Sequence, residues 1–277
     1  MLPFSEFPGE LKSNIGYVLT DIDDTLTSNG RLPALVFTAM ENLKMAGIRI
    51  VPITGRPAGW CDHIARMWPV DGLVGENGAF YYSYDWTRKK MLRRYWKTEK
   101  DRKKDRKKLD KIKHEILKKI PGCAVASDQA FREADLAIDY CEDVPPLTME
   151  DAEEIAEFFH VSGARAKISS IHVNGWFGDY DKLAMTRLFF EEVFNENLES
   201  VKDQVIFTGD SPNDSPMFGY FPSSVGVANV LHFRGKMTHE PAWVTEKEGG
   251  HGFAEMVETL LSRHRSGKLS KGSNSDR

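Results

Sequence analysis

The sequence contains little cysteine and no long apolar run. Its three cysteines, Cys61, Cys123 and Cys141, are too few and too scattered along 277 residues for a disulfide framework or a zinc site. No run approaches the roughly 18–20 apolar residues that a membrane-spanning helix requires. The first residues also lack the apolar core of a secretory signal. We therefore expect a cytoplasmic protein with no membrane partner.

The overall charge is small, but it is unevenly distributed. A net charge of −4 does not by itself select a nucleic-acid or membrane partner. Residues 88–119, however, carry 17 Lys and Arg against 5 Asp and Glu, a local charge of +12. Such a helix is usually a solvated face with local ion pairs, and aromatic residues are absent between positions 101 and 119. Binding of a nucleic acid or an acidic partner through residues 88–119 is therefore a remote alternative.

Short apolar segments and helical patterns alternate at both ends of the chain, which is typical of a parallel sheet covered by helices. The first 84 residues contain one clear helix, at 33–46, with a proline at its start and a glycine after it. The predicted strands in this part are 16–20, 48–53, 73–74 and 79–82. From residue 179 on, the sequence predicts a helix at 181–195, strands at 205–208 and 225–228, and a closing helix at 252–261.

The middle of the chain has a different pattern, with two helices and several strands that do not alternate regularly. We predict a hairpin, a charged helix at 101–120, strands near 124 and at 136–140, a helix at 148–161 and a strand at 166–173. The sequence therefore predicts an α/β core in two parts, 1–84 and 179–263, interrupted by an α+β domain at 85–178. The Ser-, Gly- and Lys-rich tail, 264–277, is expected to be disordered.

Acidic residues follow the first predicted strand in the segment Asp21-Ile22-Asp23-Asp24-Thr25. Ligands of open parallel sheets bind beyond the carboxyl ends of the strands. Two carboxylates that leave a strand there repel each other, and a divalent cation or a shared proton relieves the repulsion. A solvated acidic turn is the alternative. A calcium-binding loop is excluded, since Leu26 stands where such a loop requires glycine.

A second acidic segment, Gly209-Asp210-Ser211-Pro212-Asn213-Asp214, follows the predicted strand 205–208. Asp210 and Asp214 are four residues apart, a spacing that suits the turn into a helix. Carboxylate oxygens at this density favour Mg²⁺, which binds one or two carboxylates and keeps several waters. A helix-capping turn without a metal is the alternative.

Two weaker signals concern anion binding. Thr54 and Gly55 follow the strand 48–53, and a hydroxyl beside free backbone N–H groups can bind an anion. Lys182 lies at the start of the helix 181–195, where a positive charge is unfavourable for the helix dipole. Each signal is weak alone, because both residue types are common on protein surfaces.

Together, the four segments resemble the haloacid dehalogenase superfamily, whose motifs DxDx[TV], [ST], K and [GD]Dxx[ND/D] stand here as DIDDT, ITGR, DK and GDSPND. The chain is similar to the capped sugar-phosphate phosphatases of that superfamily, which act on mannosyl-3-phosphoglycerate, sucrose phosphate or trehalose phosphate. The resemblance implies a Rossmann-like parallel-sheet core, with residues 85–178 as an α+β cap. One departure is Asp24, which stands where glycine usually follows the second acid.

The resemblance also implies a role for each motif. Asp21 would be the nucleophile and Asp23 the general acid and base. Mg²⁺ would be bound by Asp21, the backbone carbonyl of Asp23 and Asp210, with Asp214 close by. Thr54, Gly55 and Lys182 would bind the phosphoryl group, and Lys182 would also act in catalysis by offsetting the carboxylate charge of Asp21.

The expected substrate is a small phosphomonoester, in particular a sugar phosphate. A sugar phosphomutase is the alternative, because such enzymes share all four motifs. The candidate substrate-binding residues are Arg56, Asn77, Asn174 and Asn213, and further candidates for specificity are Glu76, Arg132, Lys167 and His172.

Overall fold

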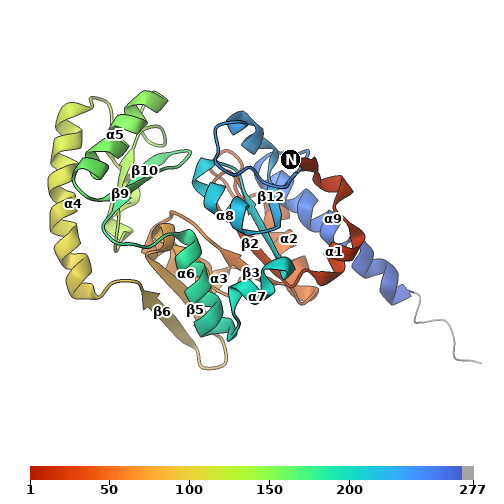
Figure 1. The fold of residues 1–277 in the computed structure, drawn as a ribbon. Coiled ribbons are helices and arrows are strands. Elements are labelled where there is room, and N and C mark those ends of the chain that lie inside the picture. The colour runs from red at the N-terminus through yellow and green to blue at the C-terminus, as the bar shows by residue number, and fades with distance from the viewer. Residues whose placement is uncertain (270–277) are drawn as a thin grey trace, which may run out of the picture. The chain divides into compact units, whose positions relative to one another are not determined.

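A computed structural model describes residues 1–269 and divides the chain into two compact units (Figure 1). The core unit comprises Met1–Pro52, Trp68–Asp71 and the chain from Asn195 onward. The second unit comprises Ile53–Met67 and Gly72–Phe194. The expected cap, 85–178, lies wholly inside the second unit, which also includes segments that we assigned to the core. The boundaries predicted for the cap therefore stay a prediction.

The core unit is built on a six-stranded parallel sheet, which confirms the predicted fold class. Its central strands are almost entirely apolar and fully buried, as expected for strands covered on both faces. In order across the sheet, the strands are β1 (Leu2–Pro3), β13 (Trp243–Val244), β12 (Ser223–Gly226), β11 (Val205–Gly209), β2 (Tyr17–Thr20) and β3 (Arg49–Pro52).

Among residues 1–269, the core unit contains five α-helices: α1 (Gly9–Asn14), α2 (Ala34–Met45), α7 (Leu198–Val201), α8 (Ser215–Tyr220) and α9 (Gly249–Leu269). The predicted helix 33–46 is confirmed as α2, which packs against α9. The closing helix begins earlier than expected and continues to Leu269, so the predicted tail is helical between 264 and 269. The rest of that tail, 270–277, lies outside the described residues.

One half of the second unit is a three-stranded antiparallel sheet of β4 (Leu73–Gly75), β5 (Phe80–Asp85) and β6 (Lys90–Tyr95). It contacts α3 (Ala58–Met67) and α6 (Lys182–Phe189), and a π-helical turn, Phe190–Phe194, extends α6. The sequence did not reveal α3. Its buried residues, Ala58, Cys61, Ile64 and Ala65, are mostly small, so they give only a weak apolar pattern.

The other half is a four-stranded antiparallel sheet with two helices, α4 (Glu99–Lys119) and α5 (Met149–Val161). In order, its strands are β7 (Ala124–Val125), β8 (Leu136–Asp139), β10 (His172–Trp176) and β9 (Arg165–Ile168). The single strand predicted at 166–173 is wrong, because β9 and β10 form a hairpin. Ser169 closes its turn, and its backbone N–H donates to the His172 carbonyl at 2.8 Å.

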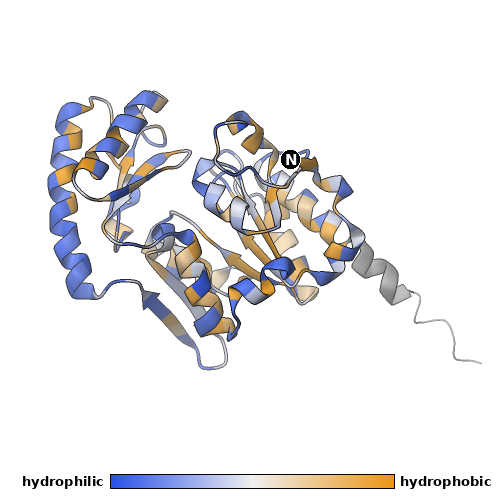
Figure 2. Ribbon diagram, viewed as in Figure 1, coloured by the Kyte–Doolittle hydropathy of each residue, from blue (hydrophilic) through white to orange (hydrophobic). Residues whose placement is uncertain are grey.

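Among residues 1–269, no helix combines the length and the apolar character needed to span a membrane. The longest helices, α4 and α9, have 21 residues each. Most of α4 is hydrophilic in Figure 2.

The layer of α4, α5 and the four-stranded sheet has its own hydrophobic core, which includes Leu109, Ile112, Ile116, Ile155, Phe159 and Val173. Gly175 on β10 lies directly against the Phe159 ring. A Cβ atom added at Gly175 would lie 2.1 Å from that ring, far inside van der Waals contact. The absence of a side chain at Gly175 therefore allows α5 to pack on the sheet.

We expect Gly175→Ala to lower the free energy of unfolding by about 1–3 kcal/mol, because the ring must move in a close-packed core. Denaturant unfolding followed by far-UV circular dichroism measures the loss. Phe159→Leu in the same chain should recover part of it, since the smaller side chain removes the clash. The comparison variant is Gly16→Ala, where an added Cβ meets only ordinary contacts. Strictly additive losses at Gly175 and Phe159 would contradict the packing argument.

Candidate active site

The two predicted acidic motifs meet at one edge of the parallel sheet. Asp21 follows β2 directly and Asp210 follows β11 directly. These strands are neighbours in the sheet, with Thr20 paired to Thr208. The Asp21 backbone N–H continues the ladder by donating to the Thr208 carbonyl at 2.9 Å. Because the strands are parallel, both acids leave the sheet at the same edge.

Asp21, Asp210 and Asp214 form a buried carboxylate cluster, with one oxygen from each residue lying within 4.8 Å of the others. Burial raises the pKa of Asp210 well above its usual value, and the nearby charges of Asp214 and Asp21 raise it further. The Thr25 hydroxyl opposes this shift by donating to Asp210 Oδ1 at 3.1 Å. Three hard oxygen ligands that repel one another fit a divalent cation, which would relieve the repulsion.

Gly209 makes room for the third acid of the cluster. The turn Pro212–Asp214 returns the chain so that Asp214 Oδ2 accepts the Asp210 backbone N–H at 3.2 Å. A Cβ atom at position 209 would lie 2.4 Å from that same oxygen. Only glycine at position 209 therefore allows the Asp214 carboxylate to lie against the end of β11.

Asp23, the second acid of the DIDDT motif, lies in the loop after β2 and has different surroundings from Asp21. Asp23 is partly exposed, and it lies outside the buried carboxylate cluster. The next residue, Asp24, has a φ of 54°, a left-handed conformation that favours glycine and that aspartate tolerates better than most residues. Asn229 holds this turn by donating from Nδ2 to the Asp24 carbonyl at 2.9 Å. The positive φ of residue 24 thus explains why glycine is the usual residue at this position of the motif.

The anion-binding candidates belong to the second unit. Thr54 is fully buried, and its hydroxyl accepts the Arg56 backbone N–H at 3.0 Å. Its carbonyl accepts the Asn77 backbone N–H at 3.1 Å. Gly55 lies against the Asn77 side chain, whose amide would be 3.3 Å from an added Cβ. The structure thus brings Thr54, Gly55 and Asn77 together.

Lys182 is buried in the first turn of α6, whose N-cap is Asp181. Gly78 belongs to the turn Glu76–Gly78 and has a φ of 105°. A Cβ atom on Gly78 would lie 2.1 Å from the Asp181 carbonyl oxygen, so this turn packs against the start of α6. A buried lysine at a helix N-terminus is unfavourable without an anion close by. The position suits a residue that binds a phosphoryl group.

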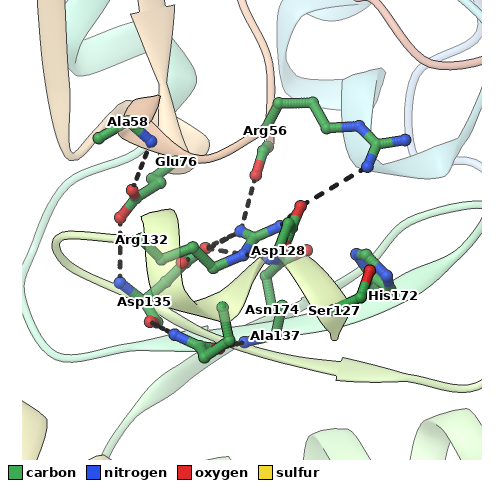
Figure 3. Close-up of polar contacts among 12 residues, drawn as sticks. Arg56, Ala58, Glu76, Ser127, Asp128, Arg132, Asp135, Ala137, His172 and Asn174 are labelled. Carbon is green, nitrogen blue, oxygen red and sulfur yellow. Dashed lines mark hydrogen bonds and ion pairs between the residues drawn. The ribbon is translucent and has the colours of Figure 1, made fainter. Parts of the chain in front are cut away.

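A buried ionic network lies beside these residues (Figure 3). The Arg132 guanidinium donates to Asp128 Oδ1 at 2.8 Å, to Asp135 at 3.1 Å and to the Gly55 carbonyl at 2.9 Å. Glu76 is fully buried, and its carboxylate accepts the backbone N–H groups of Ala58, Glu133, Ala134 and Asp135. Burial, followed by the charge of Asp135, raises the pKa of Glu76 to about 7. This network holds residues 133–135 against the start of α3.

Several candidate substrate-binding side chains already have partners. Arg56 donates to Glu142 Oε1 at 2.9 Å, and Nε2 of His172 lies 2.9 Å from Glu142 Oε2. The Asn174 amide donates to Asp135 at 2.9 Å, and Asn213 Oδ1 in the core unit accepts the Ser211 hydroxyl. These contacts order the side chains. Their predicted role in substrate binding stays a prediction.

Sequence reasoning missed some residues that order the candidate site. Thr25 was visible as the last residue of the DIDDT motif, but its bond to Asp210 depends on the register of β2 and β11. Glu142 gave no signal, because it lies in an irregular segment 86 positions from its partner Arg56. Such pairs depend on tertiary structure and leave no local pattern.

Residues 18–117 match the family model of haloacid dehalogenase-like hydrolases. This part of the chain is therefore similar in sequence to haloacid dehalogenase-like hydrolases. The match includes the DIDDT and ITGR segments and ends within α4. No curated protein matches the chain.

Solved structures with the same fold cover nearly the whole chain. A protein from Thermoplasma acidophilum is 15% identical and has a TM-score of 0.65, covering 89% of this chain and 98% of its own. A HAD/COF-like hydrolase from Plasmodium vivax, also 15% identical, has a TM-score of 0.64 and covers 90% and 96%. The sucrose-phosphatase of Synechocystis, solved with sucrose and phosphate, is 14% identical, has a TM-score of 0.60 and covers 88% and 97%. These likenesses show that the chain shares the fold of those proteins.

The carboxylate cluster predicts how metal and pH affect stability. Because the folded state raises the pKa of Asp210, it binds more protons than the unfolded chain. The stability of the metal-free protein should therefore fall as pH rises above about 4, the usual pKa of aspartate. Asp210→Asn removes this repulsion. The metal-free variant should melt at or above the wild-type temperature at pH 7.

Mg²⁺ should raise the melting temperature of the wild type and leave that of Asp210→Asn unchanged, as thermal-shift measurements with and without EDTA will report. The matched control is Asp203→Asn, which changes an exposed aspartate of the core unit and should keep the full response to Mg²⁺. An equal response to Mg²⁺ in all three proteins would contradict metal binding at the carboxylate cluster.

Proposed function

We propose that this protein is a haloacid dehalogenase-like hydrolase that acts as a Mg²⁺-dependent phosphatase and forms an aspartyl phosphate on Asp21. The observation that carries the proposal is the buried carboxylate cluster at the ends of β2 and β11. It combines a candidate nucleophile with two further acids that suit a divalent cation. The solved phosphatases that share the fold add support.

In the first step, a carboxylate oxygen of Asp21 attacks phosphorus, and the bond from phosphorus to the ester oxygen breaks. Asp23 donates a proton to the departing alcohol oxygen. In the second step, Asp23 takes a proton from a water molecule that attacks phosphorus, which releases inorganic phosphate and restores the Asp21 carboxylate. The location of Asp23 outside the carboxylate cluster suits a group that must both give and take a proton.

The remaining residues stabilise charge. Asp21, the backbone carbonyl of Asp23 and Asp210 would hold Mg²⁺, and Asp214 would orient these ligands. When bound, the metal would offset the charge of the phosphoryl group and of the carboxylates. Thr54, Gly55 and Lys182, which all belong to the second unit, would bind the phosphoryl oxygens.

For the substrate, we propose a small sugar phosphate. Structures of the same fold include the Synechocystis sucrose-phosphatase and a trehalose-6-phosphate phosphatase-related protein, the latter with a TM-score of 0.58. Arg56, Asn77, Asn174 and Asn213 remain the candidates for sugar recognition. The expected cytoplasmic location also remains a prediction.

Substitutions of Asp21 and Asp23, the two acids of the DIDDT motif, should impair different steps of the reaction. Asp21→Asn should lower the rate of phosphate release by at least about a thousandfold, because the nucleophile is lost. Asp23→Asn should lower it by about 10²–10⁴-fold, because proton transfer is lost while the nucleophile remains. Acid-quenched gels with labelled substrate should show phosphoprotein for Asp23→Asn and none for Asp21→Asn. Asp203→Asn is the matched control, and full activity of either motif variant would refute the assignment.

A screen of sugar phosphates, phosphoglycolate and nucleotides distinguishes the phosphatase from a phosphomutase. A phosphatase releases inorganic phosphate in water, and EDTA should abolish the release. A phosphomutase transfers the phosphoryl group between hydroxyls and requires a bisphosphate activator. Transfer without phosphate release would favour the mutase, and release that EDTA does not affect would exclude the proposed metal role.

A further inference from the structure

Helix α4 has a buried face and an opposite face that is strongly basic. Leu109, Ile112 and Ile116 point into the hydrophobic core shared with α5 and the four-stranded sheet. Figure 2 shows hydrophilic residues along most of the rest of the helix, which lies along one side of the second unit. The buried face therefore stabilises the second unit, whereas packing within that unit does not explain the basic face.

Five lysines lie along the face opposite the buried one: Lys100, Lys104, Lys107, Lys111 and Lys118, hereafter the lysine stripe. At 3.6 residues per turn, all five lie within about 45° of one line along the helix, over a length of about 27 Å. All five are exposed, and so is His114, the one other residue within this sector. The stripe thus contains no acidic residue.

The lysine stripe has no counter-charge of its own. Among residues 1–269, none of its lysines forms an ion pair or a hydrogen bond through its side chain. Neighbouring lysines away from the stripe do form ion pairs: Lys103 with Glu99, Lys108 with Asp105 and Lys113 with Asp110. Like charges three or four residues apart destabilise a helix. The stripe therefore weakens α4 unless an external anion balances it.

The flanks of the helix limit the shape of such a partner. Glu99 and Asp110 lie on one side of the lysine stripe, and Asp101 and Glu115 lie on the other, at about 60–100° from it. A partner that encloses the helix, as a nucleic-acid groove does, would meet these carboxylates. A flat anionic surface would meet the lysines alone. The stripe also lacks arginine and aromatic residues, which read or stack on nucleic-acid bases.

We propose that the lysine stripe of α4 adsorbs the protein to the surface of an anionic lipid bilayer. Clusters of four to eight basic residues bind such surfaces by electrostatic attraction alone. The charge of +12 on residues 88–119, against −16 on the rest of the chain, orients the molecule with α4 toward the lipid. We expected no membrane partner because the sequence has no spanning segment, but peripheral adsorption requires none.

Vesicle co-sedimentation at low ionic strength tests the proposal, with vesicles of neutral lipid alone and vesicles with about one third anionic lipid. The test variant carries K104Q, K107Q, K111Q and K118Q. The control variant carries K89Q, K90Q, K119Q and K236Q, which remove the same charge from exposed positions away from the stripe. Circular dichroism and the melting temperature report whether each variant folds.

We expect the wild type and the control to bind anionic vesicles and to leave neutral vesicles unbound. The stripe variant should bind at least about tenfold more weakly, and salt near 0.5 M should release the wild type. Absence of binding by the wild type, or equal loss in both variants, would overturn the proposal. So would tighter binding to a short DNA or RNA duplex than to vesicles, since that result would make a nucleic acid the partner.

Discussion

The mutual repulsion of three buried carboxylates is the constraint on which the candidate site depends. Asp21, Asp210 and Asp214 converge because two neighbouring parallel strands end at one edge and one turn folds back. Bringing three such charges together in a buried place is unfavourable in the absence of a cation. The carboxylate cluster therefore destabilises the metal-free fold. A divalent cation would bind more tightly because it relieves this repulsion.

The same constraint explains why small details of backbone geometry matter around the cluster. Gly209 leaves the space that the Asp214 carboxylate occupies. Thr25 donates to Asp210 and so fixes the orientation of its carboxylate. Asp24 adopts a positive φ in the loop that follows the candidate nucleophile. Each residue contributes to position rather than to chemistry.

The sequence predicted the parallel core, the ends of β2 and β11 and the acids that follow them, because those features are local and strongly patterned. It missed α3, whose buried residues are small, and it joined β9 and β10 into one strand, because the apolar pattern runs through the Ser169 turn. It could not foresee that Arg56 and His172 share Glu142, or that Asn174 bonds Asp135, since those pairings join residues far apart in sequence.

Glu76 offers a last consequence. Its carboxylate binds residues 133–135 through their backbone N–H groups and makes no use of their side chains. Substitution of those three residues by anything other than proline leaves the donors in place. At positions 133 and 134 the attachment therefore does not depend on which side chain is present. Position 135 differs, because the Asp135 carboxylate also accepts hydrogen bonds from Arg132 and Asn174. A backbone attachment of this kind would let the side chains at positions 133 and 134 vary while the anchoring geometry stays unchanged.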